Sequence, residues 1–191
     1  DAEVVTIEIE HVNLEALKEL EKRGKKVFPQ PAVLEIIKDK GLQKLFYEQK
    51  GIPTAPFRLV EGELEQHADF FPCMQKARTG GYDGKGVMKL KSVEEIQHVF
   101  EGTYVVEEMI DFAMEIAVIV SRNVNGNISN FPVVEMEFNP QANLVEFLFS
   151  PATISIELEH KAEQLAVSII EKLEMVGILA VELFLTQDGQ L

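Results

Sequence analysis

The chain has 191 residues, of which 46% are hydrophobic and 26% charged, a composition typical of one large or two small globular domains. Its formal charge of −14 argues against a nucleic-acid backbone or an anionic membrane as the main partner. No apolar run approaches the ~20 residues of a membrane span, and the first residues show no secretory signal pattern. The single cysteine, Cys73, excludes an internal disulfide and a multi-cysteine zinc site and fits a reducing compartment.

Both ends of the sequence read as positions inside a folded unit. The first residue is Asp1 rather than Met, and strand-like sequence starts almost at once. The last residues, Gln187–Leu191, resemble a hairpin turn whose second strand has barely begun. We therefore expect a piece of a longer chain.

The N-terminal quarter of the chain predicts two strands and two helical stretches. Apolar and polar residues alternate from Val4 to Glu10, as in a half-buried strand. Asn13 is a suitable N-cap for a helix that ends at Gly24. A short strand at 27–28 and helical sequence at 31–50, interrupted near 39–41, follow. The prolines at 53 and 56 then indicate an extended link and a domain boundary.

Strands dominate the rest of the sequence. Apolar runs and alternation predict them at 57–60, 73–77, 104–108, 114–122, 128–137, 144–149 and 178–186. The capping-box pattern Ser92–Glu95 predicts a helix to about Phe100, and Asn125–Asn127 predicts a hairpin. Apolar residues at helical spacing predict a long amphipathic helix over 156–175. Hairpins mix with helical crossovers, so the fold class is α+β or mixed α/β.

The most informative segment is Lys76–Val87, where four glycines within seven residues separate two strand-like stretches. Glycine lets the backbone approach a ligand closely, and successive N–H groups can cradle phosphate oxygens. Lys76, Arg78 and Lys85 add positive charge to an otherwise acidic chain. The segment is neither a P-loop nor a dinucleotide fingerprint, and the alternative interpretation is an ordinary glycine hairpin.

Several carboxylates are weaker candidates. Glu182 lies in an apolar strand, where an unpaired buried carboxylate costs several kcal/mol and a bound Mg²⁺ would remove that cost. A structural ion pair or an exposed edge position explains it equally well. Glu107, Glu108 and Glu115 lie near strand ends and could bind amines or sugar hydroxyls, or could simply be solvated. The four histidines lack metal-ligand spacing, and no pattern suggests covalent catalysis.

The run Arg78–Gly86 resembles the glycine-rich loop of ATP-grasp enzymes. In order and spacing, nearly the whole chain resembles the N5-carboxyaminoimidazole ribonucleotide synthetases among them, through Val5–Val12, Asp39–Lys44, Lys76–Val87, Val106–Glu115 and Val181–Phe184. The resemblance implies an ATP-grasp fold that lacks most of the N-terminal domain and the C-terminal part. Residues 1–27 would be the tail of a pre-ATP-grasp domain, 28–52 a helical connector, 53–110 the small subdomain and 111–191 a truncated large subdomain.

The resemblance also implies site residues. Lys40 and Lys76 would contact ATP, Lys76 at its phosphates. The loop over the phosphates would consist of Gly81, Tyr82, Asp83, Gly84, Lys85, Gly86 and Val87. The adenine would be received by Glu107, Glu108, Met109 and Ile110, the ribose hydroxyls by Glu115, and Mg²⁺ by Glu182. The catalytic and substrate-facing residues would be Tyr82, Asp83, Arg78, Glu8 and Glu10.

The implied activity is carboxylation. ATP would phosphorylate bicarbonate, and the carboxyphosphate would carboxylate the exocyclic amine of 5-aminoimidazole ribonucleotide, in a cytoplasmic homodimer serving purine synthesis. The alternatives are another ATP-grasp carboxylate–amine ligase, or a nucleotide-binding module without catalysis. Two departures weaken the match. Glu135–Phe138 replaces the family's Glu-Asn-x-His, and the family's second metal-ligand pair would come after Leu191, so we expect an incomplete active site.

Overall fold

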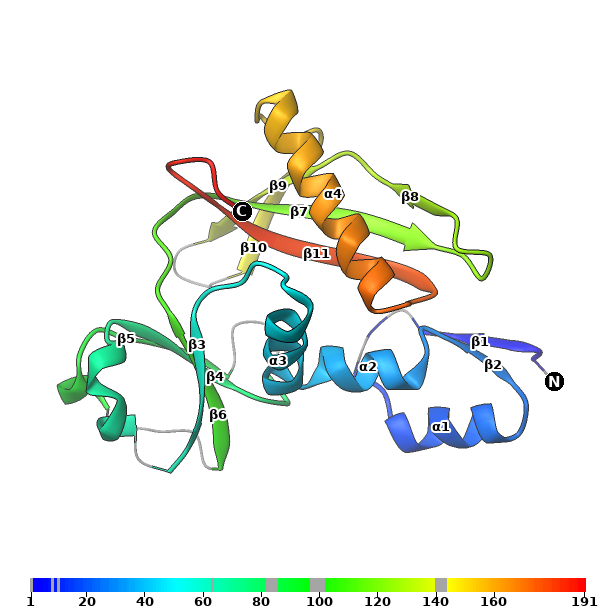
Figure 1. The fold of residues 1–191 in the computed structure, drawn as a ribbon, viewed down its shortest axis with the longest axis horizontal. Coiled ribbons are helices and arrows are strands. Elements are labelled where there is room, and N and C mark those ends of the chain that lie inside the picture. Colours follow the sequence, from blue (N-terminus) through cyan, green and yellow to red (C-terminus); the bar gives the residue numbers. More distant parts are fainter. Residues whose placement is uncertain are drawn as a thin grey trace. The chain divides into compact units, whose positions relative to one another are not determined.

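The computed structural model describes residues 2–7, 9, 11–62, 64–81, 86–96, 102–139 and 144–191. The chain forms two compact units (Figure 1). The first unit contains residues 1–38, 112–137 and 146–191, and the second contains residues 39–111 and 138–145. The chain therefore leaves the first unit after Lys38 and returns to it at Phe112.

The N-terminal part of the first unit is a small βαβ arrangement. Strand β1 (Val4–Thr6) pairs in parallel with β2 (Lys26–Phe28), with α1 (Leu14–Lys22) between them in sequence and α2 (Pro31–Lys38) after them. The predicted N-cap is confirmed, because the Asn13 side chain accepts a hydrogen bond from the Ala16 N–H at 3.0 Å. The elements share a small apolar core of Leu17, Val27 and Leu34.

The larger sheet has the strand order β10-β9-β7-β11, with β8 also paired to β7. Its strands are β7 (Phe112–Arg122), β8 (Ile128–Asn130), β9 (Val134–Asn139), β10 (Leu144–Phe149) and β11 (Gly177–Thr186). Helix α4 (Ile156–Lys172) lies across one face of β7 and β11 (Figure 1). The helix and strand side chains that meet there are almost fully buried, namely Ile116, Val118, Val120, Ala162, Ala166 and Ile170.

One strand prediction in this sheet is wrong. The single strand expected over 128–137 is two strands, β8 and β9, separated by residues 131–133. Pro132 has no N–H to donate to a neighbouring strand, so it interrupts the pairing. The predicted hairpin is confirmed, since Arg122 pairs with Ile128 and the Asn123 Oδ1 accepts hydrogen bonds from the Asn125 and Asn127 N–H groups.

The second unit contains an antiparallel sheet with the strand order β3-β6-β4-β5. Its strands are β3 (Phe57–Glu61), β4 (Cys73–Ala77), β5 (Val87–Leu90) and β6 (Thr103–Glu108). Helix α3 (Lys40–Lys50) packs against β6, and the short 3-10 segment η1 (Leu64–Phe70) follows β3. The second unit has an apolar core whose buried residues are Val60, Leu64, Cys73, Leu90, Tyr104 and Val106.

The interruption predicted near 39–41 is confirmed. Asp39 separates α2 from α3 and caps α3, because its Oδ1 accepts hydrogen bonds from the Gly41 and Leu42 N–H groups at 2.8 and 3.1 Å. Gly51 ends α3 in the left-handed conformation, at φ +61°.

The prediction of a capping box at Ser92 is wrong. The Ser92 side chain makes no capping hydrogen bond, and only the 3-10 turn η2 (Val93–Glu95) follows it. The Glu95 carboxylate instead accepts a hydrogen bond from the Lys91 N–H at 2.8 Å. The remainder of the expected helix, residues 97–100, lies outside the described residues.

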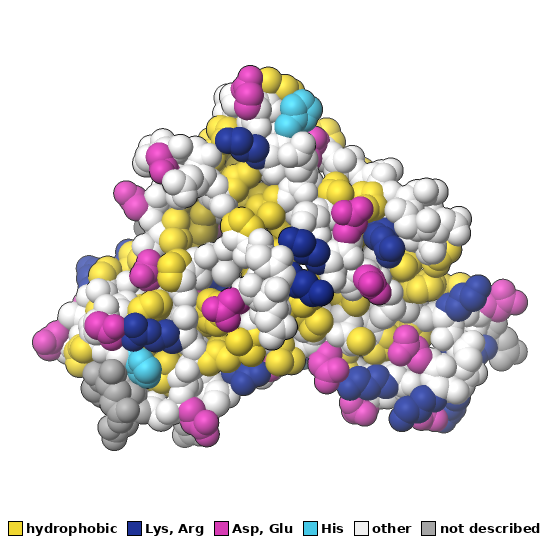
Figure 2. All heavy atoms as spheres, viewed as in Figure 1, with side chains coloured by type: hydrophobic (Ala, Val, Ile, Leu, Met, Phe, Trp, Pro, Cys, Tyr) yellow, Lys and Arg dark blue, Asp and Glu magenta, His cyan; other side chains and the backbone are white. Residues whose placement is uncertain are grey.

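The described surface is mixed in character. Acidic and basic side chains are interspersed on the face drawn in Figure 2, with hydrophobic side chains between them. Within the described ranges, no helix is long and apolar enough to cross a membrane.

Candidate functional site

Strands β4 and β6 bring Lys76 and Glu107 together. In the antiparallel register Glu107 lies opposite Met74, and Lys76 lies two residues further along β4. Side chains two residues apart on a strand share a face, so Lys76 and Glu107 are diagonal neighbours on the same face. The Lys76 ammonium donates to the Glu107 carboxylate at 2.8 Å. A lysine before the glycine segment and a glutamate expected at the adenine are therefore ion-paired.

A second lysine, Lys44 of α3, completes this cluster. Its ammonium lies 3.3 Å from Glu107 Oε1 and donates to the Thr54 hydroxyl at 2.6 Å. It also lies 5.8 Å from the centroid of the Phe57 ring. Glu107 thus contacts two ammonium groups, one through each carboxylate oxygen.

The three charged side chains of the cluster differ in burial. Their exposed fractions are 9% for Lys44, 6% for Glu107 and 23% for Lys76. Removing one partner from a buried ion pair costs about 3–5 kcal/mol, because the other charge is left uncompensated. The solvated-terminus interpretation of Glu107 is wrong, although it holds for the exposed Glu108 beside it.

Lys44 has an unusual electrostatic environment. Burial, the largest effect, lowers the pKa of Lys44 below the usual 10.5, while Glu107 opposes this shift and the neighbouring Lys76 ammonium adds to it. No sequence pattern points to Lys44, because it lies in a helix rich in charged residues. The buried residues of that helix are Gly41 and Lys44, three positions apart. Because neither is hydrophobic, this spacing gives only a weak sequence signal that Lys44 is buried.

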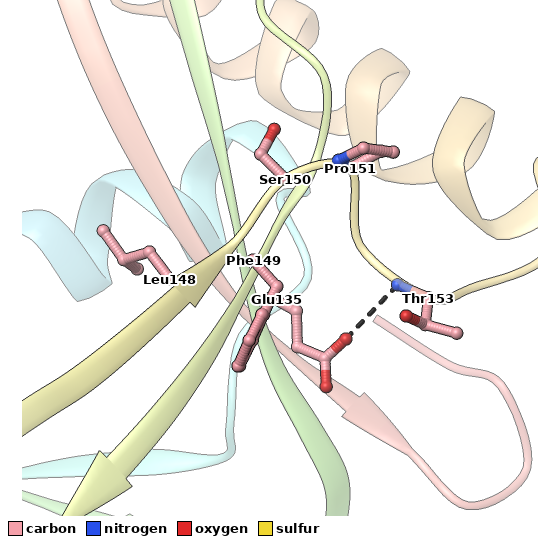
Figure 3. A pocket seen from close by; sticks show the side chains of 6 residues that line it. All are labelled: Glu135, Leu148, Phe149, Ser150, Pro151 and Thr153. Carbon is pink, nitrogen blue, oxygen red and sulfur yellow. Dashed lines mark hydrogen bonds between the residues drawn. The ribbon is translucent and has the colours of Figure 1, made fainter.

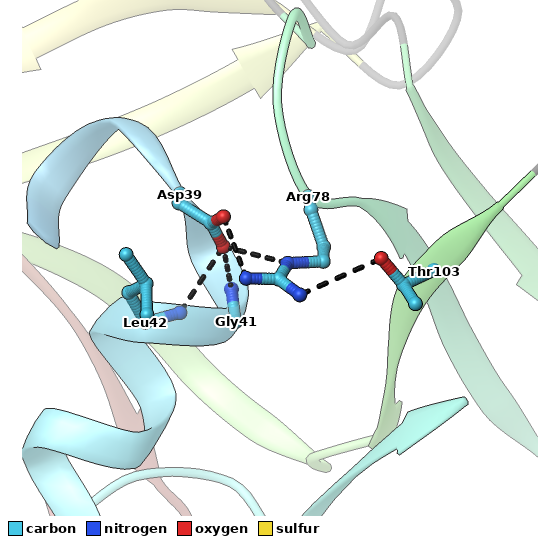
Figure 4. Close-up of polar contacts among 5 residues, drawn as sticks. All are labelled: Asp39, Gly41, Leu42, Arg78 and Thr103. Carbon is cyan, nitrogen blue, oxygen red and sulfur yellow. Dashed lines mark hydrogen bonds and ion pairs between the residues drawn. The ribbon is translucent and has the colours of Figure 1, made fainter. Parts of the chain in front are cut away.

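Arg78 lies in a separate polar contact at the start of α3 (Figure 4). Its guanidinium donates to both oxygens of Asp39, at 2.8 Å from Nε and 2.7 Å from Nη2, and reaches the Thr103 hydroxyl at 3.5 Å. A Cβ on Gly41 would lie 2.7 Å from Arg78 Nε, so a larger residue there would force the guanidinium to shift. In this structure the guanidinium therefore holds α3 to the end of β4, and the catalytic role expected for it remains a prediction.

These contacts and partial burial together shift the pKa of Asp39. Partial burial raises its pKa, but the Arg78 guanidinium and the Leu42 and Gly41 N–H groups together outweigh burial and hold the pKa below the usual 3.8. The backbone N–H of Lys40 also donates to the Arg78 carbonyl at 2.9 Å. This places Lys40, expected to contact ATP, at the same end of β4 as the glycine segment.

The two ends of the glycine segment are held close together. The Ala77 N–H donates to the Gly86 carbonyl at 2.8 Å, and a Cβ on Gly86 would lie 3.1 Å from the Gly81 Cα. Gly86 has a φ of +78°, which favours glycine. Strand β5 then starts at Val87. The residues between these ends, Tyr82, Asp83, Gly84 and Lys85, lie outside the described residues.

The segment that follows Glu107 leaves the sheet at once. The Glu108 N–H donates to the Pro56 carbonyl at 2.9 Å, and β6 ends there. Met109 and Ile110, expected with Glu107 and Glu108 to receive the adenine, are half-buried and follow the strand.

In the first unit, Glu115 and Glu182 share one face of the sheet. Glu182 lies opposite Ala117, and Glu115 lies opposite Phe184, so the two carboxylates are diagonal neighbours on β7 and β11. Phe184 stacks on Phe112 at 4.5 Å between ring centroids on this face. The burial argument for Glu182 is wrong, because β11 is the edge strand and Glu182 is exposed.

The donor set of this face suits a weakly held hard cation. In the part of the chain that the structure describes, no three His, Cys, Asp or Glu side chains gather at a metal-binding distance. Mg²⁺ in enzymes is commonly held by one or two carboxylates together with substrate phosphates and water, and an exposed Glu182 fits that pattern. Glu8 and Glu10, expected to face the substrate, lie outside the described residues.

A separate open pocket of about 570 Å³ lies in the first unit (Figure 3). It is lined by Glu135, Leu148, Phe149, Ser150, Pro151 and Thr153. The Glu135 carboxylate accepts a hydrogen bond from the Thr153 N–H at 3.2 Å, across the pocket. None of the expected ATP-contacting residues lines it.

Comparison with known proteins gives two family matches. A model of the ATP-grasp domain matches residues 45–191, and a model of the ribonucleotide synthetase preATP-grasp domain matches residues 1–38. The chain is 37% identical to a phosphoribosylaminoimidazole carboxylase of Ogataea methanolica, over 99% of this chain and 36% of that protein. It is 35% identical to an N5-carboxyaminoimidazole ribonucleotide synthase of Synechococcus elongatus, over 95% of this chain and 48% of that protein.

Solved structures show the same relationship. The N5-carboxyaminoimidazole ribonucleotide synthetase of Thermotoga maritima superimposes with a TM-score of 0.86 at 37% identity, over 99% of this chain and 49% of that one. An ADP complex of such a synthetase gives a TM-score of 0.90 at 34% identity, over 99% and 52%. The chain thus spans about half the length of most of these relatives, and about a third of the Ogataea enzyme.

Proposed function

Because the chain belongs to the ATP-grasp family, we propose that the protein is an ATP-dependent N5-carboxyaminoimidazole ribonucleotide synthetase of purine biosynthesis. Its substrates would be ATP, bicarbonate and 5-aminoimidazole ribonucleotide. The names of its relatives support this assignment, as does a similar structure from Aspergillus clavatus, 27% identical with a TM-score of 0.88, that was solved with ADP and 5-aminoimidazole ribonucleotide. From the family resemblance we also propose a cytoplasmic homodimer.

The observation that carries the proposal is the position of Lys76. Its ammonium is partly exposed at the end of β4, next to the glycine segment, and is already held by a buried carboxylate. A lysine ammonium beside a run of backbone N–H groups is suited to bind polyphosphate oxygens. We assign the phosphates to Lys76, Lys40 and the segment from Gly81 to Val87.

The remaining nucleotide contacts are assigned from the resemblance and the elements described above. Glu107 to Ile110, where β6 leaves its sheet, would receive the adenine, and Glu115 on β7 would accept from the ribose hydroxyls. Mg²⁺ held by Glu182 would neutralise charge on the phosphates when bound. Tyr82, Asp83, Arg78, Glu8 and Glu10 are proposed on the side of the aminoimidazole substrate.

The proposed reaction proceeds by two displacements. A bicarbonate oxygen attacks the γ-phosphorus of ATP, the bond to the β-phosphate oxygen breaks, and ADP leaves. The exocyclic amine then attacks the carbon of carboxyphosphate, loses a proton, and inorganic phosphate leaves. Lys76 and the backbone N–H groups stabilise negative charge on the transferring phosphoryl group, and the protein positions the amine and excludes water from a labile intermediate.

The test is product analysis with the full-length protein. Incubation with ATP, 5-aminoimidazole ribonucleotide and ¹⁴C-bicarbonate should give one acid-labile labelled carboxyl group per ADP released. Incorporation of ¹⁴C-formate instead would assign the protein to another ATP-grasp ligase. Nucleotide binding with neither incorporation would indicate a binding module without catalysis.

A further inference from the structure

The cluster around Glu107 contains one more positive charge than a simple ion pair needs. Glu107 is the only carboxylate among the described contacts of the cluster, and it touches both Lys44 and Lys76. The residues paired with Glu107 on the flanking strands, Phe57 and Met74, are uncharged. The cluster therefore carries a net charge of +1 with both lysines protonated, which suits an approaching anion.

The two lysines are not equivalent. Lys44 is nearly as buried as Glu107 and is fixed a second time by the Thr54 hydroxyl at 2.6 Å. Lys76 is more exposed, lies at the end of a strand, and has Glu107 as its one partner among the described residues. A polyphosphate would therefore draw Lys76 away from Glu107 while Lys44 stays in place.

This difference has an electrostatic consequence. When Lys76 moves to phosphate, the Glu107 carboxylate remains buried, and a buried carboxylate without a cation is costly. Lys44 meets that need, because it already contacts the other oxygen of the same carboxylate at 3.3 Å.

We propose that Lys44 is a positioning residue that keeps Glu107 neutralised and thereby releases Lys76 to bind the phosphates of ATP. The inference rests on the proposed ATP site and adds a residue that acts through Glu107 rather than on the nucleotide. Without Lys44, Lys76 would have to serve both Glu107 and the phosphates, or Glu107 would have to take up a proton.

The test is calorimetric titration of the full-length protein and its Lys44→Met variant with Mg·ATP, in buffers of different ionisation enthalpy. The variant should bind Mg·ATP at least tenfold more weakly, take up a proton on binding, and regain affinity as the pH falls. Adenosine, which has no phosphates to attract Lys76, should bind both proteins equally. The exposed Lys50 of the same helix provides the matched control, so Lys50→Met should behave as the wild type.

A second variant tests the role of the carboxylate. In the Glu107→Gln background no buried charge holds Lys76, so adding Lys44→Met should lower the affinity for Mg·ATP little further and should cause no proton uptake. If Lys44→Met is unfolded at the titration temperature, Lys44→Gln replaces it and must show the same proton uptake.

Wild-type affinity for Mg·ATP without proton uptake in a folded Lys44 variant would overturn this inference alone. Equal weakening of adenosine and Mg·ATP would also overturn it, because that is the signature of a purely structural role. Failure of the wild type to bind Mg·ATP would overturn the proposed function as well.

Discussion

At the scale of single residues, the candidate site depends on how charges surround one buried carboxylate. The Glu107 side chain is 6% exposed and contacts two ammonium groups that come from a helix and a strand far apart in sequence. Lys76, the more exposed of the two, is the residue positioned to leave this contact for a ligand. In the proposed site Lys76 therefore has the direct role and Lys44 the supporting one.

Replacing Lys76 tests the direct role. Lys76→Ala should weaken ATP binding or slow turnover at least tenfold, about 1.4 kcal/mol, because the phosphates lose a charged donor. The measurement is ATP affinity and steady-state rate in the full-length protein. The exposed Lys91→Ala serves as control and should leave both unchanged. Unaltered affinity and rate in Lys76→Ala would refute the assignment.

Part of this residue pattern was predictable from sequence and part was not. Four glycines with flanking cations indicate a phosphate loop through local chemistry, so Lys76 could be named in advance. The burial of Lys44 and Glu107 arises where α3 packs on β6, a contact between segments about 60 residues apart that no local pattern reports. Glu182 shows the reverse error, because its apolar neighbours suggested burial although β11 is an edge strand.

At the scale of elements, α3 is held to the end of β4 by one charged contact. Asp39 caps the helix through Oδ1, and both of its carboxylate oxygens accept from Arg78, which follows β4. The cap and the ion pair therefore stabilise the same junction, next to the glycine segment.

The junction predicts a pH-dependent stability. The native pKa of Asp39 is lowered, so its contribution is present above the unfolded pKa of about 3.9 and is lost as the pH falls through the lower native value. Asp39→Asn should cost about 1 kcal/mol at pH 7, since a charged acceptor becomes neutral, and the difference should shrink in acid. Urea unfolding at pH 7 and at about pH 2.5 would measure it.

The surface ion pair of Asp69 with Arg58 is the control for this prediction, because its geometry is similar and the Asp69 side chain is 67% exposed, against 19% for Asp39. Asp69→Asn should change stability much less than Asp39→Asn. Equal effects of the two substitutions at pH 7 would contradict the role given to the junction.

Glu182 is exposed on β11, so we expect its substitution to change the Mg²⁺ dependence of activity without changing the stability of the fold. Because Glu182 is exposed, Glu182→Gln should leave the unfolding free energy unchanged while raising the Mg²⁺ concentration for half-maximal activity at least tenfold. Glu171→Gln on the exposed side of α4 is the control. An unchanged Mg²⁺ requirement in Glu182→Gln would remove Glu182 from the proposed site.

Helices, strands and turns could be predicted from sequence wherever a local interaction, such as a helix cap or a turn hydrogen bond, fixes them. The Asn13 cap and the Asn125–Asn127 turn are such interactions, and both predictions are confirmed. The interruption predicted near 39–41 is explained by the cap at Asp39. The strand expected over 128–137 failed because its apolar character continues across Pro132 while the backbone pairing does not.

At the scale of the whole molecule, the chain carries an ATP-grasp domain match over residues 45–191 and spans about half of most of its relatives. Its overall charge of −14 coexists with a locally positive cluster at Lys44, Glu107 and Lys76. An anionic nucleotide is therefore compatible with an acidic protein, since local rather than net charge decides binding at a site.

The most direct test of the proposed carboxylation traces the transfer of oxygen from bicarbonate to the released phosphate. The full-length protein is supplied with ATP, 5-aminoimidazole ribonucleotide and freshly dissolved ¹⁸O-bicarbonate, and the released phosphate is analysed by mass spectrometry. Attack of bicarbonate on the γ-phosphorus predicts one ¹⁸O atom in each phosphate formed at early times, together with carboxylated nucleotide. Phosphate whose new oxygen comes from water would show that ATP is simply hydrolysed and would contradict the account.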